Sequence, residues 1–236
     1  MQLPPLTEGR ILRRYKRFLA DVALADGTCV VAHVPNTGRM SSCWAPGARV
    51  QLSRATNPRR KLAWTLERVH MGAGWVGVHT GRPNAVIAEG ISAGRLPELA
   101  GYPQLRREVP YASDGLRGRF DLALEGGNRP DALVEIKNAT LFDGERIRFP
   151  DAITQRGRKQ LALLCAARAA GVRAVVLFAV NRPEGQVFSP AWSIDPDYGQ
   201  ALLAAVEQGV EALAVRIQHS AQGMETGASL PLDLDP

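Results

Sequence analysis

Cysteine, long apolar runs and aromatic side chains are all scarce in this chain of 236 residues. The 3 cysteines (Cys29, Cys43 and Cys165) lie far apart and form no CxxC pair. This spacing excludes a zinc knuckle and a disulfide framework, and it predicts reduced thiols in the cytoplasm. No run of about 18 apolar residues occurs, so we expect no transmembrane helix and no membrane partner. The opening MQLPPLTEGR lacks the basic start and apolar segment of a secretory signal.

Internal repeats and low-complexity tracts are absent too, and the charged fraction of 22% is ordinary for a globular protein. The net charge of +6 is unevenly distributed. Residues 1–82 hold 13 Lys and Arg against 4 Asp and Glu, whereas residues 83–236 hold 16 against 19. A basic part beside a mildly acidic one predicts that the first part binds a polyanion. A basic surface that serves only solubility remains the alternative.

The first 82 residues are predicted to form a small β-barrel. Short segments rich in β-branched and aromatic residues are separated by Gly, Pro and Asn, at 9–24, 28–34, 48–55, 62–70 and 74–79. Five strands in so short a span are typical of the OB-fold, which often binds nucleic acid. Tyr15, Phe18, Trp44 and Trp64 are interleaved with basic residues, so they either stack on bases or fill the barrel core.

The pattern changes near residue 82, and residues 83–236 are predicted to form a second domain of α/β type with a mixed sheet. Helices are expected at 83–94, 153–170 and 197–208, and strands at 105–111, 118–125, 131–141, 173–180 and 212–218. The chain is therefore expected to be α+β overall, with an OB-fold-like domain at 1–82 and an α/β domain at 83–236.

The letters GAGWVG at 72–77 match the GxGxxG motif of dinucleotide-binding proteins. That motif works only where a strand leads directly into a helix whose N-terminus holds the pyrophosphate. Here Val76 and Val78 continue as strand, and Gly81 and Pro83 follow at once. The segment is therefore predicted to be a hairpin between two strands, without nucleotide binding.

The stretch LVEIKNATL at 133–141 places an acid and a base two residues apart in an apolar strand. Strand side chains alternate between faces, so Glu135 and Lys137 project from the same side. A turn around Gly126 would bring Asp121 of the preceding strand towards Glu135. Two carboxylates beside a lysine form a site for Mg²⁺ or Mn²⁺, in which the lysine orients water or stabilises charge on phosphorus. A salt bridge between Glu135 and Lys137 would explain the same letters.

Asp121, Glu135 and Lys137 match the Asp-(x)n-Glu-x-Lys pattern of PD-(D/E)XK nucleases, except that Phe120 replaces the usual proline. The predicted order αβββαβ is similar to the core of that superfamily. The first helix would supply Glu89 as a third metal ligand, although a solvated helix face explains Glu89 equally well. The second helix would present Lys159 as a catalytic residue, and Arg156 and Arg158 as contacts to nucleic acid.

Six blocks together resemble the sugar fermentation stimulation protein family, from residue 8 to about 217: RFLADVAL (17–24), PNTGRM (35–40), GRFDLAL (118–124), EIKNATL (135–141), FPDAITQRGRKQL (149–161) and AVVLFAVNR (174–182). The resemblance implies an N-terminal OB-fold, a nuclease-like second domain, largely sequence-nonspecific DNA binding and a regulatory role in sugar (maltose) metabolism. Two departures stand out. Gln160 replaces a common histidine, and GRFD replaces Ser-Arg-x-Asp.

Three functions remain open at this point. The chain binds DNA, or RNA, through a basic surface that includes Arg13, Arg14, Lys16, Arg17 and Arg39. Alternatively it is a Mg²⁺- or Mn²⁺-dependent nuclease, or its second domain has only a structural or protein-contact role in regulation. The sequence leaves the oligomeric state open, with a homodimer among the options.

Overall fold

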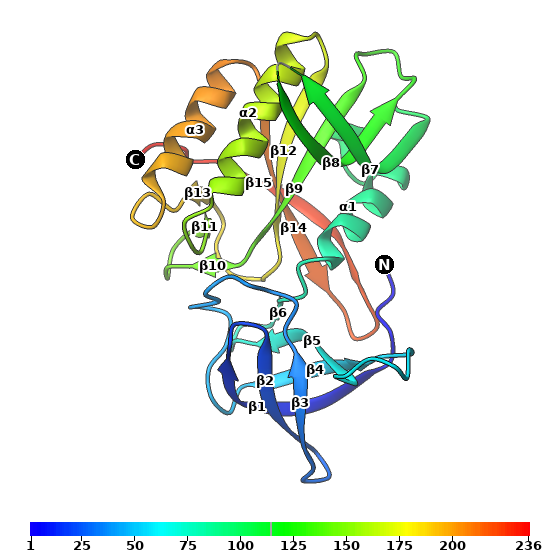
Figure 1. Ribbon diagram of the computed structural model, residues 1–236, viewed down its shortest axis with the longest axis vertical. Helices are drawn as coiled ribbons and strands as arrows, with labels where there is room; N and C mark the ends of the chain where they lie inside the picture. Colours follow the sequence, from blue (N-terminus) through cyan, green and yellow to red (C-terminus); the bar gives the residue numbers. More distant parts are fainter. Residues whose placement is uncertain (114) are drawn as a thin grey trace.

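The computed structural model describes residues 1–113 and 115–236, in which a β-barrel lies against one end of a larger α/β domain (Figure 1). The strands of the first sheet are β1 (Leu6–Tyr15), β2 (Leu19–Leu24), β3 (Cys29–His33), β4 (Arg49–Arg54), β5 (Trp64–His70) and β6 (Trp75–Gly77). Their order is β3-β2-β1-β4-β5-β6, and a parallel contact between β3 and β5 closes the barrel. Its core is aliphatic, with Ile11, Leu52 and Leu66 fully buried.

The segment 9–24, predicted as one strand, is a hairpin of β1 and β2. Lys16 and Arg17 have left-handed φ values of 49° and 65°, which reverse the chain where the sequence shows neither Gly nor Pro. The GAGWVG segment behaves as predicted: β5 and β6 pair antiparallel across it, with His70 opposite Trp75.

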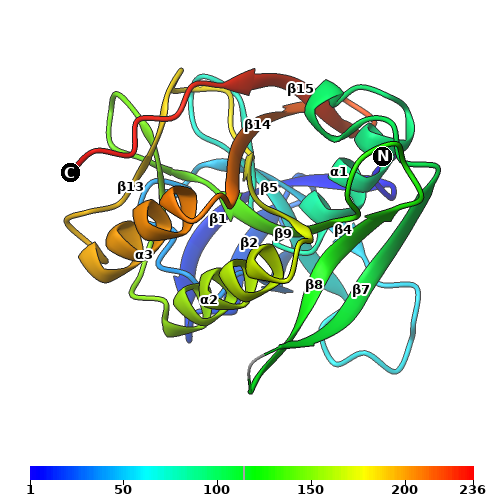
Figure 2. The same ribbon diagram turned by 90° about the horizontal axis from the view of Figure 1, so that it is seen from above.

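The second domain is a mixed sheet with helices on both faces (Figure 2). Its strands are β7 (Gln104–Ser113), β8 (Leu116–Glu125), β9 (Ala132–Ala139), β12 (Arg173–Val180), β14 (Glu211–His219) and β15 (Met224–Leu230), in the order β15-β14-β12-β9-β8-β7. The helices α2 (Gln155–Ala169) and α3 (Pro196–Glu207) cover one face, and α1 (Arg82–Ser92) covers the other, beside the short 3₁₀ helix Pro97–Leu99. The predicted combination of an OB-fold-like barrel and an α/β domain with a mixed sheet is confirmed.

The strands of this sheet follow their side-chain patterns. β12 is buried on both faces, as its continuous apolar run predicted: Val176 and Phe178 pack under α2 and α3, whereas Val175 and Leu177 pack under α1. A small sheet of β10 (Leu141–Phe142), β11 (Ile147–Phe149) and β13 (Phe188–Pro190) lies at the end facing the barrel (Figure 1). Among the described residues, no helix is both long enough and apolar enough to span a bilayer.

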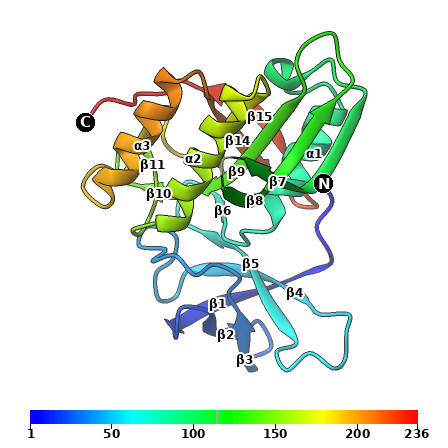
Figure 3. The ribbon, with the colours of Figure 1, turned by 45° about the horizontal axis from the view of Figure 1, so that its top comes forward.

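The barrel lies against one end of the α/β domain (Figure 3), and buried polar contacts hold the two together. Arg68 of β5 is only 1% exposed and donates to the carbonyl oxygens of Ser220 (2.8 Å) and Ala221 (3.3 Å). Arg182, also buried at 2% exposed, donates to the carbonyl oxygens of Thr140 (2.7 Å) and Ser42 (3.2 Å). Because a buried guanidinium is costly to leave unpaired, these contacts fix the two domains relative to each other.

Candidate active site

A cavity of about 260 Å³ opens where β7, β8 and β9 pass the first turns of α1 and α2. We call it the carboxylate pocket. Its polar lining includes Asn84, Glu108, Arg119, Asp121, Glu135 and Lys137. The predicted Asp121, Glu135 and Lys137 are thus brought together.

Strand register explains the meeting of the two predicted acids. β8 and β9 are antiparallel with Leu122 opposite Val134, so Asp121 and Glu135 lie at the next level of the ladder. Asp121 is fixed at both oxygens: Oδ2 accepts a hydrogen bond from the Ile136 backbone N–H (2.7 Å), and Oδ1 accepts one from Asn84 Nδ2 (2.7 Å). Burial nevertheless raises the pKa of Asp121.

Glu135 is the more buried of the two acids, with a side chain 4% exposed. Its Oε1 accepts a hydrogen bond from Lys137 Nζ at 2.6 Å, whereas its buried Oε2 has no hydrogen-bond partner. Burial raises the pKa of Glu135 to about 7, and the Asp121 charge adds to that rise while the Lys137 ammonium opposes it. The positive charge of Lys137 therefore does not offset the effect of burial on the pKa of Glu135.

Lys137 and Gln160 link the strand to helix α2. Lys137 Nζ donates to Gln160 Oε1 as well as to Glu135, so it bridges the acid and the helix. Gln160, one of the two departures noted in the sequence, therefore orients Lys137 through a neutral amide oxygen.

Only one face of α2 reaches the carboxylate pocket. Arg156 and Gln160 line it, because residues four apart lie on the same side of a helix. The predicted Lys159 and Arg158 do not. Lys159 is exposed outside the lining, and Arg158 is ion-paired with Asp197 on α3. Their predicted roles in this pocket are corrected: helix phase directs both side chains away from it.

Glu89, the predicted third acid, also lies outside the carboxylate pocket. It forms a salt bridge with the Met1 ammonium group at 2.6 Å, with its side chain 53% exposed. The α1 residue that does reach the pocket is Asn84, in the first helical turn. The prediction of Glu89 as a metal ligand is corrected for this reason.

Glu108 of β7 is a site residue that the sequence did not single out. β7 and β8 pair with Arg107 opposite Leu122 and Val109 opposite Phe120, so Glu108 lies level with Asp121. Its φ of 56° is left-handed, a strained conformation for a glutamate, and its carboxylate forms an ion pair with Arg119 at 2.7 Å. The sequence signal that could have identified Glu108 is the pairing register of β7, β8 and β9, which places it beside Asp121.

The residues present fit a divalent cation. Glu135 Oε2 is buried, unpartnered and beside a second carboxylate, and hard oxygen ligands are those that Mg²⁺ and Mn²⁺ take. Within residues 1–113 and 115–236, no three His, Cys, Asp or Glu side chains form a metal-binding group. The pocket therefore offers the neighbouring carboxylates of Asp121 and Glu135, because the third carboxylate of its lining, that of Glu108, is ion-paired with Arg119. Further ligand positions remain for water and phosphate.

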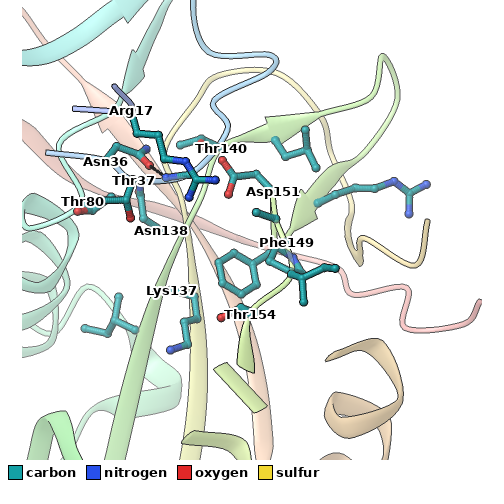
Figure 4. A pocket seen from close by; sticks show the side chains of 17 residues that line it. Arg17, Asn36, Thr37, Thr80, Lys137, Asn138, Thr140, Phe149, Asp151 and Thr154 are labelled. Carbon is teal, nitrogen blue, oxygen red and sulfur yellow. Dashed lines mark hydrogen bonds between the residues drawn. The ribbon is translucent and has the colours of Figure 1, made fainter. Parts of the chain in front are cut away.

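A second cavity, of about 360 Å³, lies between the barrel and the α/β domain (Figure 4). We call it the junction pocket. The barrel contributes Arg17, Asn36 and Thr37, and the α/β domain contributes Asn138, Phe149 and Asp151. It shares four lining residues with the carboxylate pocket: Thr80, Ile136, Lys137 and Thr154. The two pockets are therefore neighbouring parts of one groove.

The predicted basic residues of the barrel have different surroundings. Arg17 lines the junction pocket, and Lys16 and Arg39 are exposed. Arg13 is exposed but ion-paired with Asp21 at 2.6 Å. Arg14 is committed to backbone carbonyl oxygens, including those of Asn36 (2.9 Å) and Gly38 (2.8 Å). Its predicted contact with nucleic acid is corrected, because both terminal nitrogens of the guanidinium group already have partners and its Nε is buried.

Comparison with known proteins covers nearly the whole chain. Residues 12–78 match the family model described as "SfsA N-terminal OB domain", and residues 81–223 match "Sugar fermentation stimulation protein RE domain". The chain is 50% identical over 237 residues to a sugar fermentation stimulation protein homolog of Syntrophotalea carbinolica, with 100% of both chains covered. A homolog from Acidithiobacillus ferrooxidans (strain ATCC 53993 / BNL-5-31) is 47% identical, covering 98% of this chain and 99% of its own.

A solved structure, that of Pyrococcus furiosus SfsA in complex with Ca²⁺, is similar with a TM-score of 0.88. It is 26% identical in sequence, and the match covers 99% of this chain and 98% of that one. The similarity therefore extends over both domains.

Proposed function

The chain belongs to the sugar fermentation stimulation protein family, and we propose that it binds nucleic acid, in the first place DNA, along its two adjoining pockets. One observation carries the proposal. The junction pocket and the carboxylate pocket share Lys137 and Thr154, and together they extend from Arg17 of the barrel to Arg156 of α2. Such a groove, with cations at both ends, suits a phosphate backbone.

The proposed binding rests on the attraction between arginine side chains and phosphates, which depends little on the base sequence. Arginine binds phosphate oxygens through a planar set of donors, whatever base the phosphate belongs to. The excess of positive charge in residues 1–82 would add long-range attraction. Binding of this kind releases counterions, so it weakens steeply as salt is added.

Fluorescence anisotropy with labelled single-stranded DNA, duplex DNA and RNA at rising salt tests this proposal. We expect the affinity to fall with salt, Arg156→Glu to weaken binding to all sequences alike, and Arg17→Glu to weaken binding as well. Arg168→Glu is the matched control, because Arg168 is exposed on the last turn of the same helix as Arg156. Absence of binding, or binding without a salt slope, would refute the proposal.

A second candidate function, cleavage of a nucleic-acid phosphodiester bond, is favoured by the unpartnered Glu135 Oε2. Asp121 and Glu135 would hold Mg²⁺ or Mn²⁺. When bound, such a cation polarises a phosphoryl oxygen and lowers the pKa of a water molecule. The Ca²⁺ complex of the Pyrococcus furiosus protein is compatible with a cation site in this fold.

The chain's own residues would share the remaining work. Lys137, held between Glu135 and Gln160, would orient water and stabilise charge that develops on phosphorus. Asn84 keeps Asp121 in place through its hydrogen bond, and Arg156 lies where it can hold a phosphate oxygen. The α2 N-terminus at Thr154 adds a favourable dipole near that oxygen.

Calorimetric titration with Mn²⁺, together with cleavage assays on DNA and RNA, tests this second candidate. Glu135→Ala should abolish cation binding, whereas Lys137→Ala should retain it and lose cleavage. Glu89→Gln, at an acid outside the pocket, serves as the control and should leave both unchanged. Equal residual cleavage by wild type and both alanine variants would indicate a contaminant.

The regulatory role in sugar (maltose) metabolism that the family resemblance implies belongs to this proposal as a consequence of DNA binding. It predicts that Arg17→Glu, which weakens binding, also reduces the effect of the protein on growth with maltose. A purely structural α/β domain predicts no cation binding, and Glu135→Gln would then change only stability.

A further inference from the structure

Backbone strain in this protein concentrates at the two pockets. Among the described residues, four non-glycine residues have a left-handed φ: Lys16, Arg17, Met40 and Glu108. Glu108 lines the carboxylate pocket, and the other three flank the junction pocket. Strained backbone persists where surrounding contacts enforce it, and it gathers at functional sites. The junction pocket therefore shares with the carboxylate pocket this structural mark of a functional site.

The barrel wall of the junction pocket is held by one guanidinium group. Arg14 donates to the carbonyl oxygens of Arg17, Asn36, Gly38 and Arg39, which ties the β1–β2 turn to the loop after β3. Arg17 is thereby placed at the pocket rim, and no contact of its own guanidinium group occurs within the described part of the chain. An arginine whose backbone is held in place and whose guanidinium group is unengaged is suited to a ligand.

The opposite wall presents a carboxylate. Asp151 Oδ2 accepts a hydrogen bond from the Met40 backbone N–H at 3.0 Å, which leaves Oδ1 without a partner among residues 1–113 and 115–236. Figure 4 shows Arg17 and Asp151 approaching the same space from the two domains. No ion pair joins them in the described structure, so a cation and an acceptor share a cavity with room for a ligand.

Arg17 and Asp151 together indicate which kind of ligand the junction pocket binds. A carboxylate needs neighbouring N–H donors, and an arginine needs acceptors such as the O6 and N7 atoms of guanine. Guanine carries both, with N1–H and the N2 amine on one edge and O6 and N7 on another. Phe149 lines the same pocket and adds an aromatic ring.

We propose that the junction pocket binds one unpaired guanine of the strand whose phosphate lies in the carboxylate pocket. The base must be unpaired, because base pairing occupies the N1–H and N2 edge that Asp151 would read. A cavity of about 360 Å³ also has the size of a single nucleoside and cannot admit a duplex. This inference rests on the proposed binding function and narrows its substrate to a single strand, a strand end or a flipped base.

Fluorescence anisotropy with 5′-labelled oligothymidylates tests the inference, with Ca²⁺ in place of Mg²⁺ to prevent cleavage. The central nucleotide is dT, dG or deoxyinosine, which lacks the N2 amine. We expect the dG strand to bind about tenfold tighter than the dT strand, with deoxyinosine between them. The same strands annealed to complements should show no such preference.

Two variants separate the contacts. Asp151→Asn keeps an acceptor for the Met40 N–H, so the wall should fold, but it should remove the difference between dG and deoxyinosine. Arg17→Ala should weaken binding of both purines towards that of dT. Asp26→Asn is the control, since Asp26 is exposed in the β2–β3 turn; it should preserve every ratio. Thermal unfolding of each variant verifies the fold.

The outcomes also separate this inference from the proposed function. Salt-dependent binding of all strands without a preference for dG, or a difference between dG and deoxyinosine that survives Asp151→Asn, would overturn the guanine pocket and leave nucleic-acid binding standing. Absence of binding by any strand would overturn both.

Discussion

At the scale of single residues, Glu135 is held by two opposing effects. Burial and the neighbouring Asp121 favour its neutral form, whereas the Lys137 ammonium favours the anion. The balance raises its pKa to about 7. A cation that binds Glu135 must displace this proton, so cation binding and proton release are coupled.

This coupling predicts that Mn²⁺ affinity rises with pH. Between pH 6 and pH 8 the ionised fraction of one such carboxyl changes about tenfold, and the affinity should change with it. Calorimetry in buffers of different ionisation enthalpy measures both the affinity and the released proton. Glu89→Gln should show the same profile, and a flat profile in the wild type would contradict the prediction.

The sequence predicted the strand-borne site residues better than the helix-borne ones. Asp121, Glu135 and Lys137 were found because strand alternation has a period of two and tolerates no ambiguity of face. Asn84 in place of Glu89, and Gln160 in place of Lys159, depend on the rotation of a helix about its axis. Tertiary packing sets that rotation, and the spacing of charged letters does not reveal it.

At the scale of elements, the hairpin of β1 and β2 depends on Arg14. Its guanidinium group gathers four carbonyl oxygens that neither strand pairs, and it holds Lys16 and Arg17 in their left-handed conformations. Adjacent Arg13 is exposed, with one ion pair to Asp21. We therefore expect Arg14 to contribute much more to the stability of the hairpin than Arg13.

Arg14→Ala is accordingly expected to lower the free energy of unfolding by about 2 kcal/mol, because it leaves partly buried carbonyl oxygens without donors. Arg13→Ala is the matched control and should change it by less than about 0.5 kcal/mol. Denaturant unfolding followed by circular dichroism measures both. Equal effects of the two substitutions would show that the hydrogen bonds of the Arg14 guanidinium group do not stabilise the fold.

Most elements of the α/β domain were predictable, because their apolar periodicity is strong and Gly or Pro marks their ends. The exceptions have physical reasons. β11 and β13 are too short for a period to show, and β15 (Met224–Leu230) carries Gly227 and exposed polar residues at the sheet edge. The β1–β2 turn was missed because a distant guanidinium group, rather than a local glycine, stabilises it.

At the scale of the whole molecule, His219 lies in the junction between the domains. Its Nε2 donates to Asn181 Oδ1 (2.7 Å), and its Nδ1 faces Arg68 at 3.5 Å. Asn181 Nδ2 donates to Asn138, which assigns Oδ1 as the acceptor. Burial and the Arg68 charge lower the pKa of His219 from 6.5 to about 4, so the ring is neutral in the folded protein.

Because the unfolded chain binds this proton more readily, stability should fall as pH drops from 6.5 towards 4. The loss from this group is at most about 1.4 kcal/mol per pH unit. His219→Gln keeps a donor for Asn181 and should flatten that part of the profile, whereas His70→Gln on the barrel serves as the control. Identical denaturation profiles for wild type and His219→Gln would contradict the prediction.

The close approach of Gly38 to Asp151 has a consequence for domain exchange. A β-carbon at position 38 would lie 2.3 Å from Asp151 Oδ2, so any other residue there would force the Asp151 carboxylate to move from its place. A chimera that combines this barrel with the α/β half of a relative must therefore transplant the glycine and the aspartate as a pair.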